Sequence, residues 1–228
     1  MAFPGLNERV SEVRARIDAA VQRGGRGQNV RIVAVTKTHG PEAVIAAHDA
    51  GLGDVGENRV QEAIGKMSEV DVPVRWHLIG HLQRNKVKSL TRFELFHALD
   101  SVKLADSVNA FAIESGATIN ALVQVNVVGE ETKGGLSLGE VEQNASWLAS
   151  LDGVRIKGVM TMARFEADEK ELRRTFSGAR DALETLARHG AAQATELSMG
   201  MSGDYEIAVE EGATMVRLGT TLFGARDQ

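Results

Sequence analysis

The sequence contains no cysteine among its 228 residues. Disulfides, thiolate nucleophiles and cysteine-ligated zinc are therefore excluded. Aromatic side chains make up only 4% of the residues, and the two tryptophans, Trp76 and Trp147, are too far apart to predict a binding platform. No apolar run approaches the length of a transmembrane helix, and the N-terminal residues become charged too early for a secretory signal peptide. We therefore expect a cytoplasmic protein that does not enter a membrane.

Neither sign of charge is in large excess, because 26 basic and 31 acidic residues give a net charge of −5. Such a balance provides no general attraction toward nucleic acid or an anionic membrane surface. The six histidines do not form a metal-binding pattern. His77 and His81 are four residues apart, but Gly80 and a predicted strand end separate them, so a shared helical face is not expected. We predict no nucleic-acid partner and no bound metal.

Apolar residues make up 43% of the sequence, enough for a large core. An amphipathic helix is predicted over residues 6–23, and eight short apolar runs follow it, most of them separated by helical patterns. Several of these helices end in glycine, which is typical of a helix C-terminus. The predicted strands are 30–36, 54–57, 74–79, 94–99, 119–127, 154–162, 195–199 and 214–218.

This alternation predicts a single α/β domain over residues 1–228, a parallel (β/α)8 barrel preceded by an extra N-terminal helix. An open doubly wound sheet is the competing architecture. It would normally use fewer strands, and no GxGxxG motif follows the first apolar run. The barrel is therefore the favoured prediction.

Lys37 stands at the end of the first predicted strand, in the sequence VAVTKT. In a barrel of this kind, functional residues gather at the carboxyl ends of the strands. A lysine buried there would have a lowered pKa, because the charged amine loses hydration, and a neutral amine can condense with an aldehyde or ketone. The alternative is a lysine whose stem packs on the strand end while its amine stays in water.

The loops after the seventh and eighth strands predict an anion site. Ser202 lies in the first of these loops, and Gly219 and Thr220 lie in the second. Hydroxyls and glycine amides in such loops commonly bind phosphate. Arg217 is two residues before Gly219, so both point to the same side of the strand. Two alternatives remain open: Ser202 caps the following helix, and Arg217 forms a structural ion pair.

A lysine, an anion site and an arginine around one cavity fit a phosphorylated aldehyde. The amine would take the carbonyl group, and the two loops would take the phosphate. From the residues alone, two kinds of protein satisfy this pattern. One is an aldolase that forms a lysine imine with sugar phosphates, and the other binds pyridoxal phosphate.

Five segments carry a resemblance to a known family: VAVTKT, GENRVQE, WHLIGHLQRNK, TMARF and LSMGMSGDYEIAVEEGATMVRLGTTLFG. In this order they resemble the pyridoxal phosphate homeostasis protein family, whose fold is similar to the N-terminal barrel of bacterial alanine racemases. The resemblance extends over about residues 6–226. It implies pyridoxal 5'-phosphate as cofactor, with Lys37 as the internal aldimine lysine. It also implies that Ser202, Gly219 and Thr220 surround the phosphate, and that Arg217 lies beside the pyridine nitrogen.

The same resemblance implies that Asn58, His77 and Ser198 line the cavity. Asn58, with its neighbours Glu57 and Arg59, is interpreted either as facing the 3-hydroxyl side of the cofactor or as part of a loop hydrogen-bond network. His81 departs from the family pattern, where a smaller residue is expected. The polar segment 129–135 is interpreted as a surface loop, with a mobile lid as the alternative.

An arginine beside the pyridine nitrogen restrains catalysis. Arginine only donates hydrogen bonds, so the ring nitrogen must be an unprotonated acceptor, and the ring becomes a weak electron sink. A racemase also needs a second acid or base on the face opposite the lysine. Alanine racemases supply a tyrosine there from a second domain, which this sequence does not show. Its single tyrosine, Tyr205, lies beside the predicted phosphate loop, where packing or capping is expected.

We therefore predict a monomeric protein that binds, buffers or delivers pyridoxal phosphate in intracellular vitamin B6 homeostasis. Its further partners would be enzymes that lack their pyridoxal phosphate. The alternative function is a weak amino-acid racemase.

Overall fold

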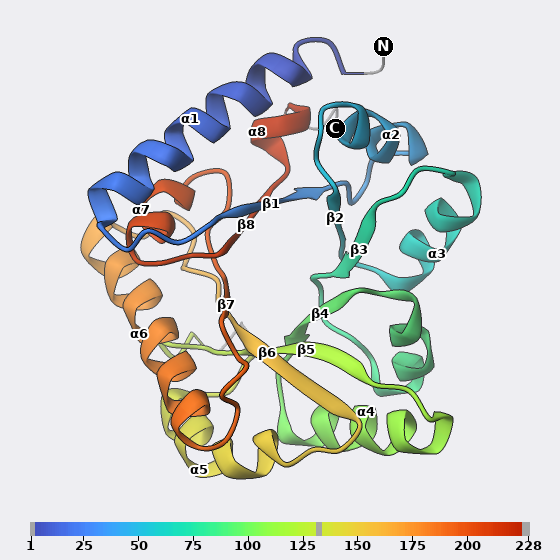
Figure 1. Ribbon diagram of the computed structural model, residues 1–228, viewed down its shortest axis with the longest axis vertical. Coiled ribbons are helices and arrows are strands. Elements are labelled where there is room, and N and C mark those ends of the chain that lie inside the picture. The colour runs from blue at the N-terminus through green and yellow to red at the C-terminus, as the bar shows by residue number, and fades with distance from the viewer. Residues whose placement is uncertain (1–2, 131–133, 225–228) are drawn as a thin grey trace.

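The computed structural model describes residues 3–130 and 134–224. Eight parallel strands follow one another in chain order and close into a barrel, as Figure 1 shows. Closure occurs where the first strand pairs with the last, with Val33 opposite Arg217. The strands are β1 (Arg31–Val35), β2 (Asp54–Glu57), β3 (Arg75–Leu78), β4 (Leu95–Leu99), β5 (Ile119–Gln124), β6 (Val154–Met160), β7 (Glu196–Ser198) and β8 (Met215–Leu218). The predicted barrel is confirmed.

Helices surround the strands on the outside of the barrel (Figure 1). The extra N-terminal helix α1 (Leu6–Gly24) is confirmed and packs against the last two helices of the chain. None of the helices in the described ranges is long and apolar enough to span a membrane. The others are α2 (Pro41–Asp49), α3 (Val60–Glu69), the 3-10 helix η1 (Arg84–Arg92), α4 (Val102–Ser115), α5 (Leu138–Ala149), α6 (Glu169–Arg188), α7 (Tyr205–Glu210) and α8 (Thr220–Phe223).

Local sequence signals set several helix boundaries. Helix α5 begins with a capping box, in which the Ser137 side chain accepts from the Glu140 amide and the Glu140 carboxylate accepts from the Ser137 amide. Helix α6 begins at the cap residue Asp168. Helix α4 ends at Gly116, whose φ of 65° lies in the left-handed region that glycine adopts readily.

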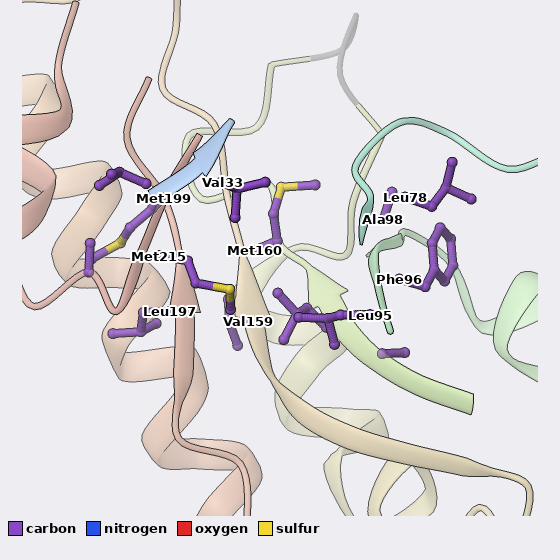
Figure 2. Packing of buried hydrophobic residues seen from close by; sticks show 14 of the residues in the cluster. Val33, Leu78, Leu95, Phe96, Ala98, Val159, Met160, Leu197, Met199 and Met215 are labelled. Atoms are coloured by element: carbon purple, nitrogen blue, oxygen red, sulfur yellow. The ribbon is translucent and has the colours of Figure 1, made fainter. Parts of the chain in front are cut away.

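The core has two layers, because side chains on each strand alternate between the barrel interior and the space beneath the helices. Figure 2 shows buried hydrophobic side chains of this core, among them Val33, Met160 and Met215, which are completely buried. Helix α1 buries one face of its surface against the barrel, at Leu6, Val10, Val13, Ile17 and Ala20. This is the face that the sequence pattern predicts.

Most strands are shorter than the sequence predicts by one residue at an end, and two of them end two or three residues early. The strand predicted over 119–127 ends at Gln124, because the Asn126 side chain draws the chain into a turn by accepting from the amides of Gly129 and Glu130, each at 3.1 Å. The strand predicted over 154–162 ends at Met160. Within it, Gly158 has a φ of 155°, and a Cβ there would lie 1.9 Å from the Glu196 carbonyl oxygen. The close approach of β7 therefore requires glycine at this position.

Candidate functional site

The carboxyl ends of β1 and β2 place Lys37 and Asn58 beside each other at one end of the barrel. The Thr36 amide donates to the Gly56 carbonyl at 3.1 Å, so the two strands stay paired up to the residue before Lys37. Lys37 is partly buried in the turn that follows β1. Asn58 is also partly buried, and its side-chain amide makes no hydrogen bond with any residue of the described ranges. Its amide is thus not used in a loop network.

The loops after β7 and β8 meet at the same end of the barrel. The Ser202 hydroxyl accepts from the Thr221 amide at 3.2 Å, which joins the two loops. Gly219 lies against β1, since a Cβ at this glycine would be 3.5 Å from the Val35 carbonyl oxygen. Lys37 is only two residues beyond Val35. The structure therefore brings Lys37 and the predicted phosphate loops together.

These loops have the features of an anion site. Asp204 is the N-cap residue of α7 but makes no side-chain cap, and Ser202 accepts from the first turn of α8, so the alternative in which Ser202 caps α7 is not observed. The hydroxyl of Thr220 makes no hydrogen bond with the residues described and is exposed. Gly203 and Gly219 both have negative φ, and a Cβ would meet only ordinary contacts at Gly219 and none at Gly203. Packing therefore does not demand these glycines, which leave room for a ligand such as phosphate.

Arg217 reaches into the barrel from β8 and is 4% exposed. Its Nη1 donates to the Ser198 hydroxyl at 2.7 Å, and its Nη2 donates to the Thr161 carbonyl at 2.9 Å. Both acceptors are neutral, and in ranges 3–130 and 134–224 no carboxylate lies within ion-pair distance of Arg217, although the charge of Asp204 acts on it from further away. The structural ion pair considered above is therefore absent there. Burial lowers the pKa of Arg217 to about 10, so it stays protonated at neutral pH.

A row of hydrogen-bonded side chains continues from Arg217 across the barrel interior. Ser198 contacts His97 Nδ1 at 2.9 Å, and His97 Nε2 contacts His77 Nδ1 at 2.9 Å. His77 Nε2 then contacts Asp54 Oδ1 at 2.8 Å. We call these five residues the interior polar row.

The interior polar row changes the interpretation of two predicted site residues. His77 and Ser198 are completely buried, and both ring nitrogens of His77 are occupied by protein. His77 thus lies inside the barrel and contacts the site through other side chains. Sequence reasoning missed His97 and Asp54. The available signal was a polar residue, His97, flanked on its own strand face by Leu95 and Leu99.

A second polar cluster lies outside the barrel, beneath the segment that carries Lys37. Lys66 of α3 is 5% exposed, and its Nζ donates to Glu57 at 2.7 Å, to Glu62 at 2.9 Å and to the Thr36 carbonyl at 2.8 Å. Glu57 therefore faces α3 rather than the cavity, on the opposite side of its strand from the site. Burial raises the pKa of Glu57, although hydrogen bonds from Lys66 and Thr36 oppose this shift.

This cluster fixes the backbone on both sides of Lys37. Thr38 has a φ of 69°, an uncommon conformation for a β-branched residue, and its amide donates to Glu62 at 2.6 Å. On the other side, the Thr36 carbonyl is bonded to Lys66. The turn is thus anchored at both neighbours of Lys37, which favours one orientation of the lysine.

His81 and the segment 129–135 lie at neighbouring parts of the same barrel end. His81, which departs from the family pattern, is exposed and contacts Asp100 at 2.6 Å, joining the loops after β3 and β4. Residues 131–133 lie outside the described residues, so the surface-loop and lid interpretations of segment 129–135 remain predictions. Among the residues that are described, no three potential metal ligands lie together.

The single tyrosine follows the Ser202 loop but belongs to the helical side of the fold. Tyr205 is 4% exposed and lies at the start of α7, where it interacts electrostatically with Arg16 of α1. Burial raises the pKa of its hydroxyl. Because α1 covers the outside of the barrel, the phenol is on the helical side of the fold and packs there, as the sequence predicts.

The structure is a parallel barrel with a lysine after its first strand and open, glycine-containing loops after its last two. Residues 9–227 match the family described as alanine racemase, N-terminal domain. A pyridoxal phosphate homeostasis protein of Aquifex aeolicus is 40% identical over 222 residues, covering 96% of this chain and 97% of that protein. The chain belongs to the pyridoxal phosphate homeostasis protein family.

Solved structures agree with this assignment. PipY of Synechococcus elongatus, solved with pyridoxal phosphate bound, has a TM-score of 0.85 and 34% identity. That comparison covers 96% of this chain and 100% of PipY. An alanine racemase from Corynebacterium glutamicum, with a TM-score of 0.72 and 16% identity over 93% of this chain and 60% of its own, shares the fold alone.

Proposed function

We propose that this protein binds pyridoxal 5'-phosphate and keeps it available in cytoplasmic vitamin B6 homeostasis. The observation that carries the proposal is the position of Arg217, a buried guanidinium whose hydrogen-bond acceptors are both neutral. It lies below the end of the barrel that holds Lys37 and two open loops containing glycine. The relationship to PipY, solved with pyridoxal phosphate bound, supports the same ligand.

In this proposal each residue has a separate task. The Lys37 amine adds to the aldehyde carbon and water leaves, which gives a reversible imine. Ser202, Gly219 and Thr220 hold the phosphate through hydroxyl and amide donors. Arg217 donates toward the pyridine nitrogen. When bound, the cofactor supplies an electron-withdrawing ring, and a donor-only arginine limits that property because it does not protonate the nitrogen.

Asn58 borders the ring, because its unbonded side-chain amide lies at the end of the strand next to Lys37. His77 and Ser198 contribute from within the barrel, behind Arg217. We place the entire function in one barrel domain over residues 1–228, acting as a monomer. The acceptors of released cofactor would be enzymes that lack their pyridoxal phosphate.

A carrier or buffer is favoured over an enzyme. Racemisation needs a proton donor on the face of the cofactor opposite Lys37. Tyr205, the single tyrosine of the sequence, interacts with Arg16 on the helical side of the barrel, which supports a packing role. Weak racemase activity remains the alternative. It predicts Lys37-dependent entry of solvent deuterium at the α-carbon of an amino acid, whereas a carrier gives no such exchange above the Lys37→Ala background.

The visible absorption spectrum tests the proposal directly. Adding pyridoxal phosphate to the parent protein is expected to give an imine band that Lys37→Ala lacks, because only an amine at this position reaches the aldehyde. Lys88→Ala is the matched control, since Lys88 is exposed on η1, and it should keep the band. A parent protein without the band would overturn the proposed function. A sugar phosphate trapped on Lys37 by borohydride would then indicate the aldolase instead.

A further inference from the structure

The interior polar row joins the candidate site to the opposite end of the barrel. Its five members come from five different strands, β2, β3, β4, β7 and β8, and each is at most 4% exposed. One end is the donor Arg217, and the other is the carboxylate Asp54. Asp54 borders a cavity of about 360 Å³ that is also lined by Arg31 and Arg75 and lies at the amino ends of β1, β2 and β3.

The two charged ends fix the direction of every hydrogen bond in the row. Arg217 can only donate, so Ser198 accepts from it and directs its own proton to His97 Nδ1. His97 must then carry its proton on Nε2 and donate it to His77 Nδ1. His77 in turn carries its proton on Nε2 and donates to Asp54. In this arrangement each donor has one acceptor, and neither ring needs a second proton.

Charged groups surround the Asp54 end of the row. Asp54 also accepts from Arg75 of β3, at 2.7 Å, and lies near Arg31 of β1, whose partner on β7 is Glu196. Burial alone would raise the pKa of Asp54, but hydrogen bonds from His77 and Arg75 hold it well below its usual range.

At the other end of the row, His97 faces Arg217. Burial keeps the pKa of His97 well below its usual value, and positive charge on His77, Arg217 and Arg31 acts in the same direction. A doubly protonated His77 would reverse the bonds toward Ser198. The Ser198 hydroxyl would then receive two donors, and its own proton would lose its partner.

We propose that Asp54, His77 and His97 are positioning residues that hold Ser198 as an acceptor for Arg217, so that Arg217 keeps a single donor arrangement toward the cofactor's ring nitrogen. This inference rests on the proposed function. It assigns to a carboxylate at the far end of the barrel an influence on a ligand at the mouth. The influence passes through side chains that are otherwise sealed from solvent.

The first experiment uses the ligand-free parent protein, so its result does not depend on whether a variant folds. Nitrogen-15 NMR of the histidine side chains should show His77 and His97 as neutral Nε2–H tautomers between pH 6 and pH 8. An imidazolium or an Nδ1–H tautomer at either residue would overturn the proposal, because the bonds would then run in another direction. This measurement is independent of whether the cofactor binds.

The second experiment measures pyridoxal phosphate affinity and the pH dependence of the bound cofactor's visible band. His97→Leu should weaken binding about tenfold, the effect of one charge-assisted hydrogen bond, and shift the pH profile of the band. Asp54→Asn keeps the side-chain volume but removes the charge that sets the direction of the hydrogen bonds in the row. It should therefore change the pH profile of the visible band, with a smaller loss of affinity than His97→Leu. His48→Asn, at a partly exposed position on α2, is the matched control and should match the parent.

The outcomes separate the two proposals. If the parent binds the cofactor and folded Asp54→Asn shows an unchanged affinity and pH profile, the positioning role is wrong while the proposed function stands. If the parent does not bind at all, the proposed function fails. Far-ultraviolet circular dichroism of each variant establishes that it is folded before either comparison is made.

Discussion

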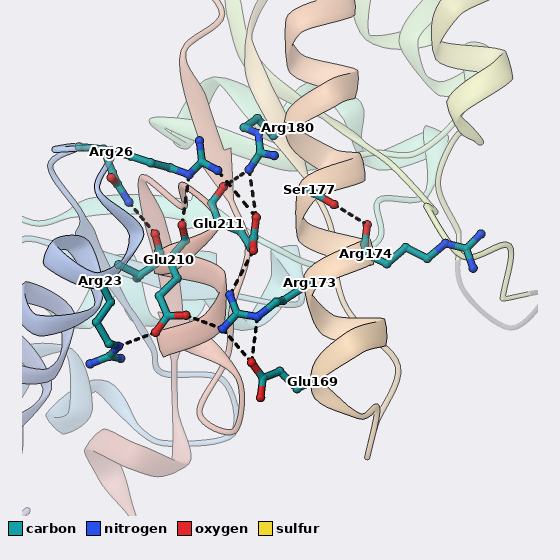
Figure 3. A network of polar contacts seen from close by, with 11 residues as sticks. Arg23, Arg26, Glu169, Arg173, Arg174, Ser177, Arg180, Glu210 and Glu211 are labelled. Atoms are coloured by element: carbon teal, nitrogen blue, oxygen red, sulfur yellow. Dashed lines mark hydrogen bonds and ion pairs between the residues drawn. The ribbon is translucent and has the colours of Figure 1, made fainter.

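The protein contains two polar systems of similar size that are built in opposite ways. The first is an outer ion-pair network of Arg23, Arg173, Arg180, Glu210 and Glu211, which joins α1, α6 and α7 (Figure 3). Its arginine side chains are 25–49% exposed, and Arg173 contacts both glutamates. Several partners share each charge, and water reaches most of them.

The second is the interior polar row, whose groups are at most 4% exposed and mainly neutral. Each histidine ring nitrogen there has a single partner, and a lost partner leaves a buried donor or acceptor unsatisfied. The outer network should therefore lose stability gradually as members are removed, and its energy should be screened by salt. The interior row should respond strongly to the loss of any member, because water does not replace the missing bond.

The largest expected difference comes from Asp54→Ala. This change leaves the buried His77 N–H without an acceptor and should lower the free energy of unfolding by about 3 kcal/mol. Urea denaturation followed by circular dichroism measures the loss. Asp181→Ala, at an exposed position on α6, is the control and should stay within about 0.5 kcal/mol of the parent. Equal effects at the two positions would contradict the contrast between buried and exposed polar groups.

Acid should reduce the contribution of Asp54. The folded-state pKa of Asp54 is depressed, so its stabilising contribution is complete above the unfolded-state pKa of about 3.9 and is lost as pH falls below that value. The stability difference between parent and Asp54→Asn should shrink by on the order of 2 kcal/mol from pH 7 to low pH. Comparing these two proteins cancels the opposite contribution of Glu57, whose pKa is raised. A difference that does not change with pH would show that the carboxylate charge is not involved.

The smallest effect should come from the outer network. Arg173→Gln removes contacts with Glu169, Glu210 and Glu211 and should cost about 1 kcal/mol at low salt. At about 1 M salt most of this cost should disappear, because charges are then screened within about 3 Å. Arg174→Gln on the same helix is the control, since its guanidinium points away from the network (Figure 3). A salt-independent loss at Arg173 would indicate packing by its stem instead.

The fold was predictable from the sequence because its signals are local. Alternating apolar runs and helical patterns, with glycines such as Gly116 at helix ends, need only neighbouring residues to be recognised. The strand ends also place Lys37, Ser202 and Gly219 at one end of any such barrel. Only the strand lengths were wrong, at turns set by side chains such as Asn126.

The interior polar row was not predictable in the same way. His97 bonds to Ser198, which is 101 residues away, and to His77, which is 20 residues away. No local pattern encodes such contacts, because they depend on which inward side chains meet at the same height in the barrel. The orientation of Glu57 stayed open for a related reason: strand parity alone leaves open which of two neighbouring residues faces inward, and Lys66 on α3 decides it.

The closure of the barrel has a consequence for folding. Lys37 follows the first strand, whereas Gly219 and Thr220 follow the last, and β1 must pair with β8 before they become neighbours. This contact has a very large sequence separation, so its loop-closure entropy makes it a late event during folding. A ligand that bridges the seam binds only the closed barrel, and its binding free energy therefore adds to the stability of closure. For a polypeptide still leaving the ribosome, occupancy of the site would report that the final strand has been inserted.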